Sequence, residues 1–272
     1  MAIYAKDNIE FFHRSKRNKP YRMPVAHFHN KYELYFLVKG KTKYFIENEI
    51  FLLSPYDMIF VPKGVFHKTD SEENYDVERV LFSFDDEFIG EDLNEYITEL
   101  INNKYIQFSG ENIYKIEDII NKIEKESIKK QRGYTDMQKL YFKQLIITIS
   151  RYRIKENNTR LNGSYLVIQD IVKYISKNYN QDLSLNSLSK KYSISPNHLS
   201  KQFKNVTGVG LNEYINISRI TAAEKLLVST NKPITLVATE CGFNDSNYFA
   251  AVFKKLKGIT PKKYSSINKL GV

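Results

Sequence analysis

The sequence predicts an α+β protein, in which an antiparallel β-barrel with appended helices precedes an all-α domain. Three observations indicate this class. Short strand-like segments separated by turn residues occupy residues 20–84. Apolar residues recur at helical spacing after residue 86. One pattern of phenylalanine, lysine, glycine and tyrosine occurs twice between residues 194 and 264, with Phe203 repeated as Phe253 at an offset of 50 (253 − 203).

Alternating apolar and polar residues mark the strands of the first region. Residues 33–37 and 41–47 alternate on either side of Gly40, and residues 77–84 form a further strand. Turn residues at 54–57 and 62–64 separate the segments between them. Short strands of this kind predict a small antiparallel barrel or sandwich at about 20–84.

A basic run precedes these strands. We expect it to form a solvated arm, and movement on ligand binding or contact with DNA are the alternatives. Its members are His13, Arg14, Lys16, Arg17, Lys19 and Arg22.

Residues 86–154 are expected to be helical, with apolar stripes that must be buried on the barrel, on each other or on a second subunit. One stripe comprises Ile113, Ile116, Ile119, Ile120 and Ile123, and the next comprises Met137, Leu140, Tyr141, Leu145, Ile149 and Tyr152. Thr135 or Asp136 is available to cap the last helix. We expect homodimerisation through helices in 86–154, with the isoleucine face as one candidate contact.

The domain boundary is expected in the polar, glycine-containing segment 155–164, which gives domains at 1–158 and 163–272. The second domain begins with a helix through residues 166–179. Each copy of the repeat then reads as a helix-turn-helix. In the first copy Ser184 caps one helix, Ser195-Pro196 begins the next, and Gly208 ends it.

A linking helix follows from Tyr214 to Leu227 and is broken at Lys232-Pro233. The second copy begins at Ile234, turns at Gly242-Phe243, restarts at Asn244 or Asp245, and ends at Gly258, where Thr260-Pro261 stops any continuation. Ser189 and Ala238 are the small residues that let the two helices of each unit cross closely. Ser189 lies 14 residues before Phe203 (203 − 189), and Ala238 lies 15 residues before Phe253 (253 − 238). The second turn should therefore be one residue longer.

The charge of the chain is concentrated in the segment that carries the repeat. Residues 1–160 hold 26 basic and 25 acidic residues (26 − 25 = +1), and residues 161–272 hold 15 and 6 (15 − 6 = +9). A basic helix-turn-helix domain is typical of a DNA-binding protein. No apolar run approaches membrane-spanning length and the first residues are polar, so we expect no membrane segment or export signal. The single Cys241 fits the reducing cytoplasm and should be a core residue.

The second domain resembles the DNA-binding domain of AraC/XylS-type transcription regulators. The matching positions are Leu188, Ser195-Pro-x-x-Leu199, Phe203-Lys204, Gly208, Tyr214, Arg219-Ile220-x-x-Ala223-x-x-Leu226-Leu227, Ile234-x-x-Val237-Ala238, Gly242-Phe243, Tyr248-Phe249, Phe253-Lys254, Gly258 and Thr260-Pro261-x-x-Tyr264. Ser265 stands where an arginine is frequent. The resemblance implies that the second helix of each unit enters the major groove of DNA.

The resemblance also implies which residues contact DNA. Asn197, Ser200 and Lys201 would face base edges from the first unit, and Ser246 and Asn247 from the second. Lys204, Lys254 and Lys255 would hold phosphates. Ala250 and Ala251 occupy positions that are often polar in the family. The second unit is therefore expected to read fewer bases.

The first domain resembles the cupin-like sensor barrel found in such regulators. The pattern is His27-x-His29-x-x-x-Glu33, Gly40 and Pro62-x-Gly64-x-x-His67, with Tyr56 where a glycine is usual. The resemblance implies an effector site for a small molecule, such as a carbohydrate, formed by His27, His29, Glu33, Tyr35, Tyr44 and His67. In enzymes with this fold, residues matching His27, His29, Glu33 and His67 bind a metal, whereas regulators commonly bind none. We expect no metal or other cofactor, and these four remain the candidate ligands.

The predicted function is a cytoplasmic, dimeric, effector-responsive transcription activator that binds duplex DNA and contacts RNA polymerase, with no catalytic residues. Two alternatives stay open. One is a cupin metalloenzyme with a DNA-binding appendage, and the other is a ligand-independent regulator whose barrel only dimerises.

Overall fold

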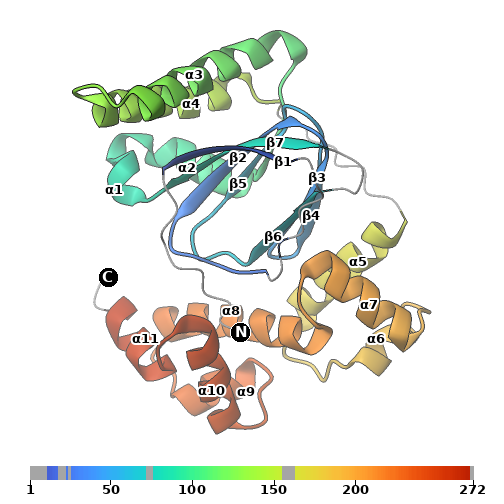
Figure 1. The fold of residues 1–272 in the computed structure, drawn as a ribbon. Helices are drawn as coiled ribbons and strands as arrows, with labels where there is room; N and C mark the ends of the chain where they lie inside the picture. Colours follow the sequence, from blue (N-terminus) through green and yellow to red (C-terminus); the bar gives the residue numbers. More distant parts are fainter. Residues whose placement is uncertain (1–10, 18–22, 24–25, 72–75, 155–162, 270–272) are drawn as a thin grey trace.

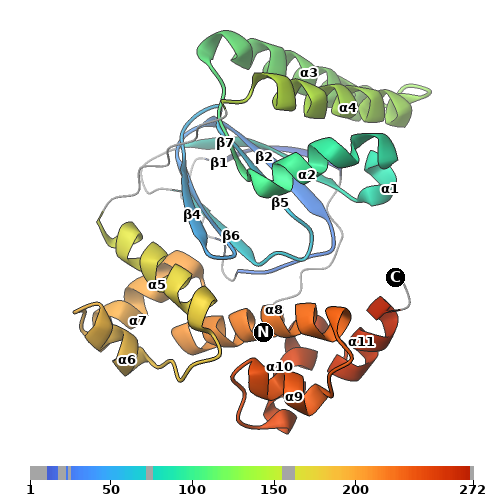
Figure 2. The same cartoon turned by 180° about the vertical axis from the view of Figure 1, so that it is seen from behind.

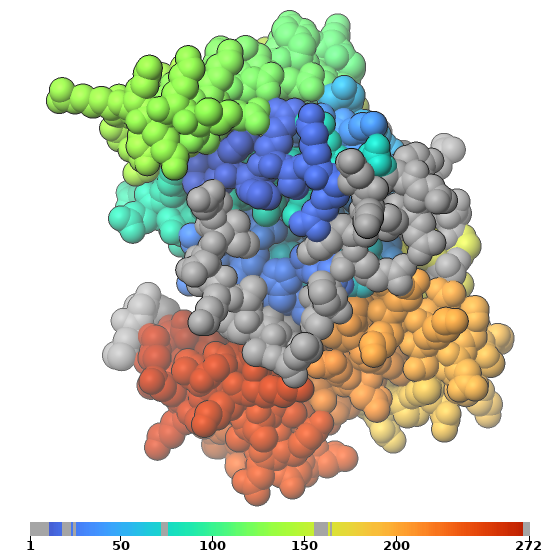
Figure 3. Space-filling model, in the orientation of Figure 1, coloured from blue at the N-terminus to red at the C-terminus, as the bar shows by residue number. Residues whose placement is uncertain are grey.

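The computed structural model describes residues 11–17, 23, 26–71, 76–154 and 163–269. Figures 1 and 2 show four layers: a layer of helices, two β-sheets face to face, and a second helical domain below them. Figure 3 shows the same tiers as packed surfaces. In the described part of the chain, no helix is long and apolar enough to cross a membrane.

Two antiparallel sheets form the centre of the first domain and confirm the predicted class. The larger sheet has the order β1-β7-β2-β5-β8, and the smaller has the order β4-β3-β6. The strands are β1 (Phe12–Arg17), β2 (Tyr32–Lys39), β3 (Thr42–Ile46), β4 (Glu49–Leu53), β5 (Met58–Val61), β6 (His67–Ser71), β7 (Val77–Phe84) and β8 (Tyr105–Ile106). Strand β2 is buried on both faces: Tyr35 and Leu37 point between the sheets, and Leu34 and Phe36 point to the helices.

The helices that follow strand β7 in the sequence pack on the outer face of the larger sheet, on the side away from the second domain (Figure 1). They are α1 (Asp86–Ile89), the 3-10 turn η1 (Glu91–Leu93), α2 (Asn94–Asn102), α3 (Gly110–Lys129) and α4 (Tyr134–Tyr152). The isoleucine stripe of α3 is buried in this core, since Ile116 and Ile123 are both fully enclosed. The prediction that this face mediates dimerisation is therefore wrong.

The apolar stripe predicted for α4 is rotated from the one in the structure. Leu140 is 60% exposed, whereas Phe142 and Ile146, which were not on the predicted stripe, are buried. The helix also begins earlier, with Gly133 as its N-cap in place of Thr135 or Asp136. Phe142 takes the core position because its ring lies against Phe82 and Phe84 of the sheet.

The predicted N-terminal arm is wrong for residues 12–17, which form β1 along the edge of the larger sheet and pair with β7. Arg14 lies within 2.8 Å of Glu78 and 2.7 Å of Glu124. These two carboxylates stabilise the basic strand on the sheet, because without them its charged side chains would favour full exposure to water. Lys19 and Arg22 lie outside the described residues. Strand β8 was not predicted either, and it interrupts the helical region.

The second domain confirms the predicted pair of helix-turn-helix units. Its helices are α5 (Ser164–Asn178), α6 (Leu185–Lys191), α7 (Pro196–Thr207), α8 (Leu211–Ser229), α9 (Ile234–Glu240), α10 (Ser246–Lys257) and α11 (Pro261–Lys269). Residues 192–195 join α6 to α7 and residues 241–245 join α9 to α10, so the second turn is one residue longer, as predicted. Cys241 is buried, which confirms its core position. Helix α11 was missed, because Pro261 begins a helix as well as ending the preceding segment.

The second helical domain packs directly on the outer face of the smaller sheet (Figure 1). Phe45 and Ile50 from this sheet share one buried cluster with Phe203 and Tyr214 of the helical domain. Gln169 of α5 accepts a hydrogen bond of 2.6 Å from the backbone N–H of Ile50. The smaller sheet therefore supports the first helix-turn-helix unit.

Candidate DNA interface and ligand site

Helix α7 is built so that its polar residues remain on the surface. Ser195 is the N-cap and accepts from the backbone N–H of His198, and Pro196 occupies the first turn. Leu199 and Phe203 are buried and fix the inner face of the helix. The predicted contact residues on the remaining surface are all exposed: Asn197, Ser200, Lys201 and Lys204.

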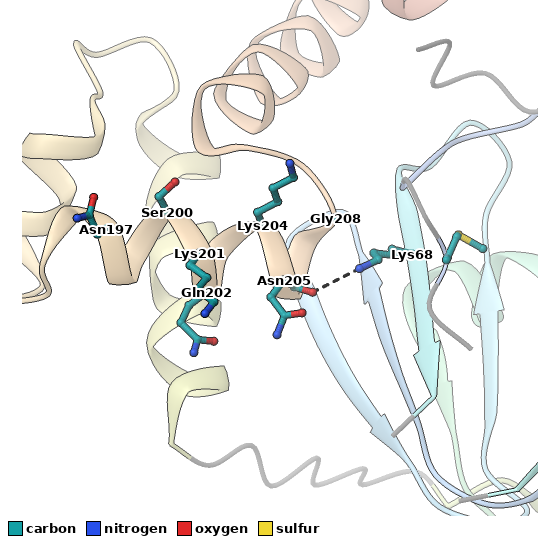
Figure 4. Close-up of a pocket in the computed structure, with 9 residues that line it drawn as sticks. Lys68, Asn197, Ser200, Lys201, Gln202, Lys204, Asn205 and Gly208 are labelled. Atoms are coloured by element: carbon teal, nitrogen blue, oxygen red, sulfur yellow. Dashed lines mark hydrogen bonds between the residues drawn. The ribbon is translucent and has the colours of Figure 1, made fainter. Parts of the chain in front are cut away.

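A hollow of about 740 Å³ lies beside α7, between this helix and strand β6 (Figure 4). It brings together all four predicted residues of the first unit. It also adds two polar residues that sequence reasoning missed, Gln202 and Asn205. In Figure 4, Ser200 and Lys204 project from one side of α7, and Lys201 projects from the other with Gln202 and Asn205.

The second unit presents a less polar surface. Asp245 is the N-cap of α10 and accepts from the backbone N–H groups of Asn247 and Tyr248 at 2.6 and 3.0 Å. Ser246 and Asn247 are exposed in the first turn, as predicted, and Ala251 is exposed at the next turn. Tyr248, in the same turn of α10, is 53% exposed and was missed as a contact candidate.

Three of the four predicted phosphate- or base-contacting lysines carry an uncompensated charge. Among the described residues, Lys201, Lys204 and Lys254 have no ion-pair partner, and all three are exposed. Lys255 differs, because its Nζ lies 3.7 Å from Oε1 of Glu213. Exposed cations along two helices attract a polyanion, and desolvation costs them little.

Four of the six predicted effector residues meet at one end of the sheet pair. Single ligand atoms of His27, His29 and His67 lie within 4.8 Å of one another. Nε2 of His29 lies 2.9 Å from Oε1 of Glu33, and Nε2 of His67 lies 3.6 Å from Oε2. His27 and His29 precede strand β2, which carries Glu33. His27 instead forms an isolated bridge with His67.

The electrostatics of this cluster follow from its burial. Burial alone would raise the pKa of Glu33, but the hydrogen bond from His29 and the neighbouring imidazoles lower it to about 2. Burial lowers the pKa of His67 to about 4, even though Glu33 opposes the shift. At neutral pH the cluster therefore contains a carboxylate and an uncharged His67.

The other two predicted effector residues, Tyr35 and Tyr44, lie in the packed interior between the sheets. Their ring centroids are 5.0 Å apart, and each residue is 1% exposed. A cavity lined by Tyr35 among the described residues has a volume of only about 10 Å³. That space is smaller than a sugar by an order of magnitude.

The histidine cluster fits a divalent metal chemically. Three imidazoles and one carboxylate are the donor types preferred by Zn²⁺ and related ions. Nε2 of His67 is buried and has no hydrogen-bond partner among the described residues, so a donor atom already points into the cluster. His27, His29, Glu33 and His67 are thus able to hold such an ion.

Tyr56 shows why the departure from the sensor pattern is tolerated. It has a φ of 74°, the left-handed conformation that glycine favours. Its neighbour Asp57 accepts from the Tyr105 hydroxyl at 2.7 Å and from the backbone N–H of Ser54 at 2.8 Å. The turn therefore keeps the backbone geometry of a glycine turn without the glycine.

Comparisons with known proteins agree with this architecture. Residues 8–99 match the family model of an AraC-like ligand binding domain, and residues 188–266 match that of a helix-turn-helix domain. Together the two ranges cover more than half of the chain. The HTH-type transcriptional activator RhaR of Enterobacter sp. (strain 638) is 24% identical over 90% of this chain and 88% of the relative. RhaR of Mannheimia succiniciproducens is 23% identical over 88% and 86%.

Among solved structures, ToxT from Vibrio cholerae is 17% identical, covering 95% of this chain and 99% of that chain with a TM-score of 0.36. The C-terminal domain of AraT from Geobacillus stearothermophilus is 31% identical, covering 37% of this chain and 84% of that chain with a TM-score of 0.36. The curated relatives are transcription regulators, a class distinct from enzymes. The chain belongs to the AraC family of DNA-binding transcription regulators, with an AraC-like ligand-binding domain followed by a helix-turn-helix domain.

Proposed function

We propose that this regulator is a cytoplasmic, homodimeric activator whose DNA binding responds to a ligand held in the sensor barrel. The observation that carries the proposal is the direct packing of the sensor sheet on the first helix-turn-helix unit. Activation is supported by the relatives, which are named transcriptional activators. An activator of this kind would also contact RNA polymerase. The proposal assigns no catalytic residue.

The first unit supplies most of the base recognition. Lys201 is suited to guanine and Asn197 to adenine, because these side chains match the acceptors and donors on those base edges. Ser200 assists them. Ser246 and Asn247 read fewer positions from α10, since the exposed Ala251 beyond them offers only apolar contact. Lys204, Lys254 and Lys255 bind phosphates, and Lys255 exchanges its contact with Glu213 for one with DNA.

Dimerisation uses the exposed apolar residues of α3 and α4 in place of the buried isoleucine stripe. Ile128 at the end of α3 is 74% exposed, and Leu140 near the start of α4 is 60% exposed. Large apolar side chains at such exposure favour burial against a second copy. The sensor domain would thereby set the distance between two DNA-binding domains.

The effector binds at the histidine cluster, where four of the six predicted residues converge. A carbohydrate would need Tyr35 and Tyr44 to separate, because the interior between the sheets is packed. A smaller ligand needs no such opening. The cluster is therefore the better-supported part of the predicted site.

Selection from a random duplex library tests the proposed function. The full chain is incubated with the library, bound duplexes are recovered, and enriched sequences are measured by fluorescence anisotropy. We expect an enriched site with two contact regions about 10 base pairs apart, and affinity that falls steeply with salt. Binding without enrichment would reject sequence-specific regulation. A ligand-independent regulator would still enrich a site and would show no ligand response.

A further inference from the structure

Helix α8 joins the two helix-turn-helix units. Figures 1 and 2 show α6 and α7 toward one end of this helix and α9 to α11 toward the other. Near its start, the ring of Tyr214 lies 5.4 Å from that of Phe203 in α7. Near its end, Glu224 pairs with Lys257 of α10 at 2.8 Å. Each unit is thus attached to a different half of one helix.

A single connecting helix does not by itself fix how far apart the two recognition helices lie. Packed helices can slide and turn slightly against one another. A unit that touches only α8 could therefore turn about the axis of that helix, and the separation of α7 from α10 would vary. A second contact between the units, away from the axis of α8, removes this freedom.

Arg219, near the middle of α8, reaches the first unit through its guanidinium. Its Nε donates to the carbonyl of Tyr179 at 2.8 Å, and its Nη2 donates to the carbonyl of Gln181 at 3.0 Å. Tyr179 is the C-cap of α5, and Gln181 lies in the segment that leads to Ser184, the N-cap of α6. Two donors of one planar group therefore hold the backbone that enters the first unit.

The same guanidinium contacts the second unit. Its Cζ lies 5.6 Å from the centre of the Phe243 ring, in the turn between α9 and α10. A cation over an aromatic ring is a favourable contact. Phe243 is buried, and its ring lies 5.1 Å from that of Phe249 and 6.1 Å from that of Tyr248, both in α10. Arg219 therefore connects the entry of α6 with the start of α10.

The backbones of the two units also meet beside Arg219. Gly242, with a φ of 85°, lies in the second turn, and a Cβ there would be 2.8 Å from Cα of Asn180 and 3.1 Å from Nε of Arg219. The corresponding residue of the first turn is Ser193, which has a φ of 54° and carries a side chain. Both turns use the left-handed conformation, but the second has the added constraint of the backbone at Asn180.

We infer that Arg219 is a positioning residue that fixes the separation of α7 and α10, and thereby the spacing between the two contact regions that this protein accepts on DNA. The inference rests on the proposed function, in which both helices enter the major groove. Arginine suits the role because it has two donors in a fixed plane and a face for the Phe243 ring. A lysine has one nitrogen and cannot make the three contacts together.

The expected effect follows from the geometry of the duplex. One base pair inserted between the contact regions moves one of them by about 3.4 Å along the axis and turns it by about 35°. A rigid pair of units cannot follow this change, so base contacts of one unit are lost. Each lost base contact lowers affinity by roughly 5- to 150-fold. Units released from Arg219 can adjust and should lose less.

The test uses the full chain and a duplex that the parent selects from a random library. Footprinting locates the two contact regions, and one base pair is then inserted or removed between them. Fluorescence anisotropy gives the ratio of the affinities at the original and altered spacings. Lower stability alone would weaken binding at every spacing and leave this ratio unchanged.

We expect the parent to prefer the original spacing by at least about 5-fold. Arg219→Lys, which keeps the charge, and Arg219→Gln should both lose most of that preference. Phe243→Leu removes the ring and keeps an apolar side chain, so it tests the same contact from the second unit and should also lose preference. Circular dichroism verifies that the variants fold.

The matched control is Lys225→Gln, which removes one positive charge from an exposed position of the same helix. It should keep the spacing ratio of the parent. A parent that binds all spacings equally would overturn the inference, and so would folded variants of Arg219 and Phe243 that keep the ratio of the parent. Specific binding would survive in both cases, whereas the proposed function fails if the parent binds no duplex specifically.

Discussion

The hydroxyl of Tyr214 donates a 2.8 Å hydrogen bond to the backbone carbonyl of Glu47, which joins helix α8 to the turn between β3 and β4. The Tyr214 ring lies 5.4 Å from that of Phe203 in α7 and 5.9 Å from that of Phe45 in the sensor sheet. Tyr214 belongs to the sequence repeat of the DNA-binding domain, and it is therefore also part of the interface between the two domains. Its ring contacts both the core residue Phe203 of α7 and Phe45 of the sensor sheet.

Tyr214→Phe should keep the packing of the ring and lose the hydrogen bond. Because the group is buried, we expect the free energy of unfolding to fall by about 1 kcal/mol in urea denaturation. Tyr114→Phe is the control, since Tyr114 is 63% exposed and should change nothing. Equal stability of the Tyr214 variant and the parent would show that the contact between the domains is not formed in solution.

Gly208 and Gly258 end the two recognition helices in the same left-handed conformation, with φ of 85° and 75°. A Cβ at Gly258 would meet nothing within 4 Å, whereas one at Gly208 would lie 2.6 Å from Cδ of Lys68 and 3.2 Å from Ala26. Gly258→Ala should therefore cost about 1–2 kcal/mol from backbone strain alone. Gly208→Ala should cost more, because the sensor must also move. Equal losses in thermal unfolding would contradict the close approach of Ala26 and Lys68.

Gln169 of α5 is 5% exposed and forms two hydrogen bonds with the backbone of the sensor. Its side chain accepts from the N–H of Ile50 and donates to the carbonyl of Asn48. Gln169→Leu leaves both backbone groups without this partner, so we expect a loss of roughly 1–3 kcal/mol for each group that stays buried. Gln144→Leu, at an exposed position of α4, is the control. Hydrogen exchange at Ile50 should accelerate only in the Gln169 variant; unchanged exchange there would refute the bond.

Ile128→Asp and Leu140→Asp should dissociate the proposed dimer, because a buried unpaired carboxylate is strongly unfavourable at an interface. Light scattering with size-exclusion chromatography measures the mass of each variant against that of the parent. Leu236→Asp is the control, since Leu236 is 43% exposed on α9, outside the proposed interface. A parent that is monomeric, or variants that remain dimeric, would exclude this contact.

The sequence predicted local features of the fold more reliably than distant contacts. Ser195, Pro196 and Gly208 determine the ends of α7 through neighbours in the chain, so their pattern is readable directly. The isoleucines of α3 were correctly assigned to a buried face, but helical spacing cannot say which surface covers that face. The basic strand β1 was missed because its stability depends on Glu78 and Glu124, which are far away in the sequence.

For the candidate sites too, the sequence predicted local patterns but not contacts between residues distant in the chain. The spacing of His27, His29 and Glu33 and the later His67 indicated a cluster, and the structure brings these four together. The contact of Lys68 with Asn205 joins residues 137 positions apart, and no local pattern marks it. Likewise, Tyr35 and Tyr44 carry hydroxyls suited to a ligand, but only the packing between the sheets reveals that the space is filled.

The most direct test of the central claim, that α7 reads bases in the major groove, is the effect of Lys201→Ala on a duplex selected by the parent. Affinity for that duplex should fall by about 1–3 kcal/mol, and preference at one base position should be lost. Lys125→Ala, an exposed lysine on α3, should leave both unchanged. If Lys201→Ala bound the selected duplex with the affinity and base preference of the parent, the assigned orientation of α7 on DNA would be wrong.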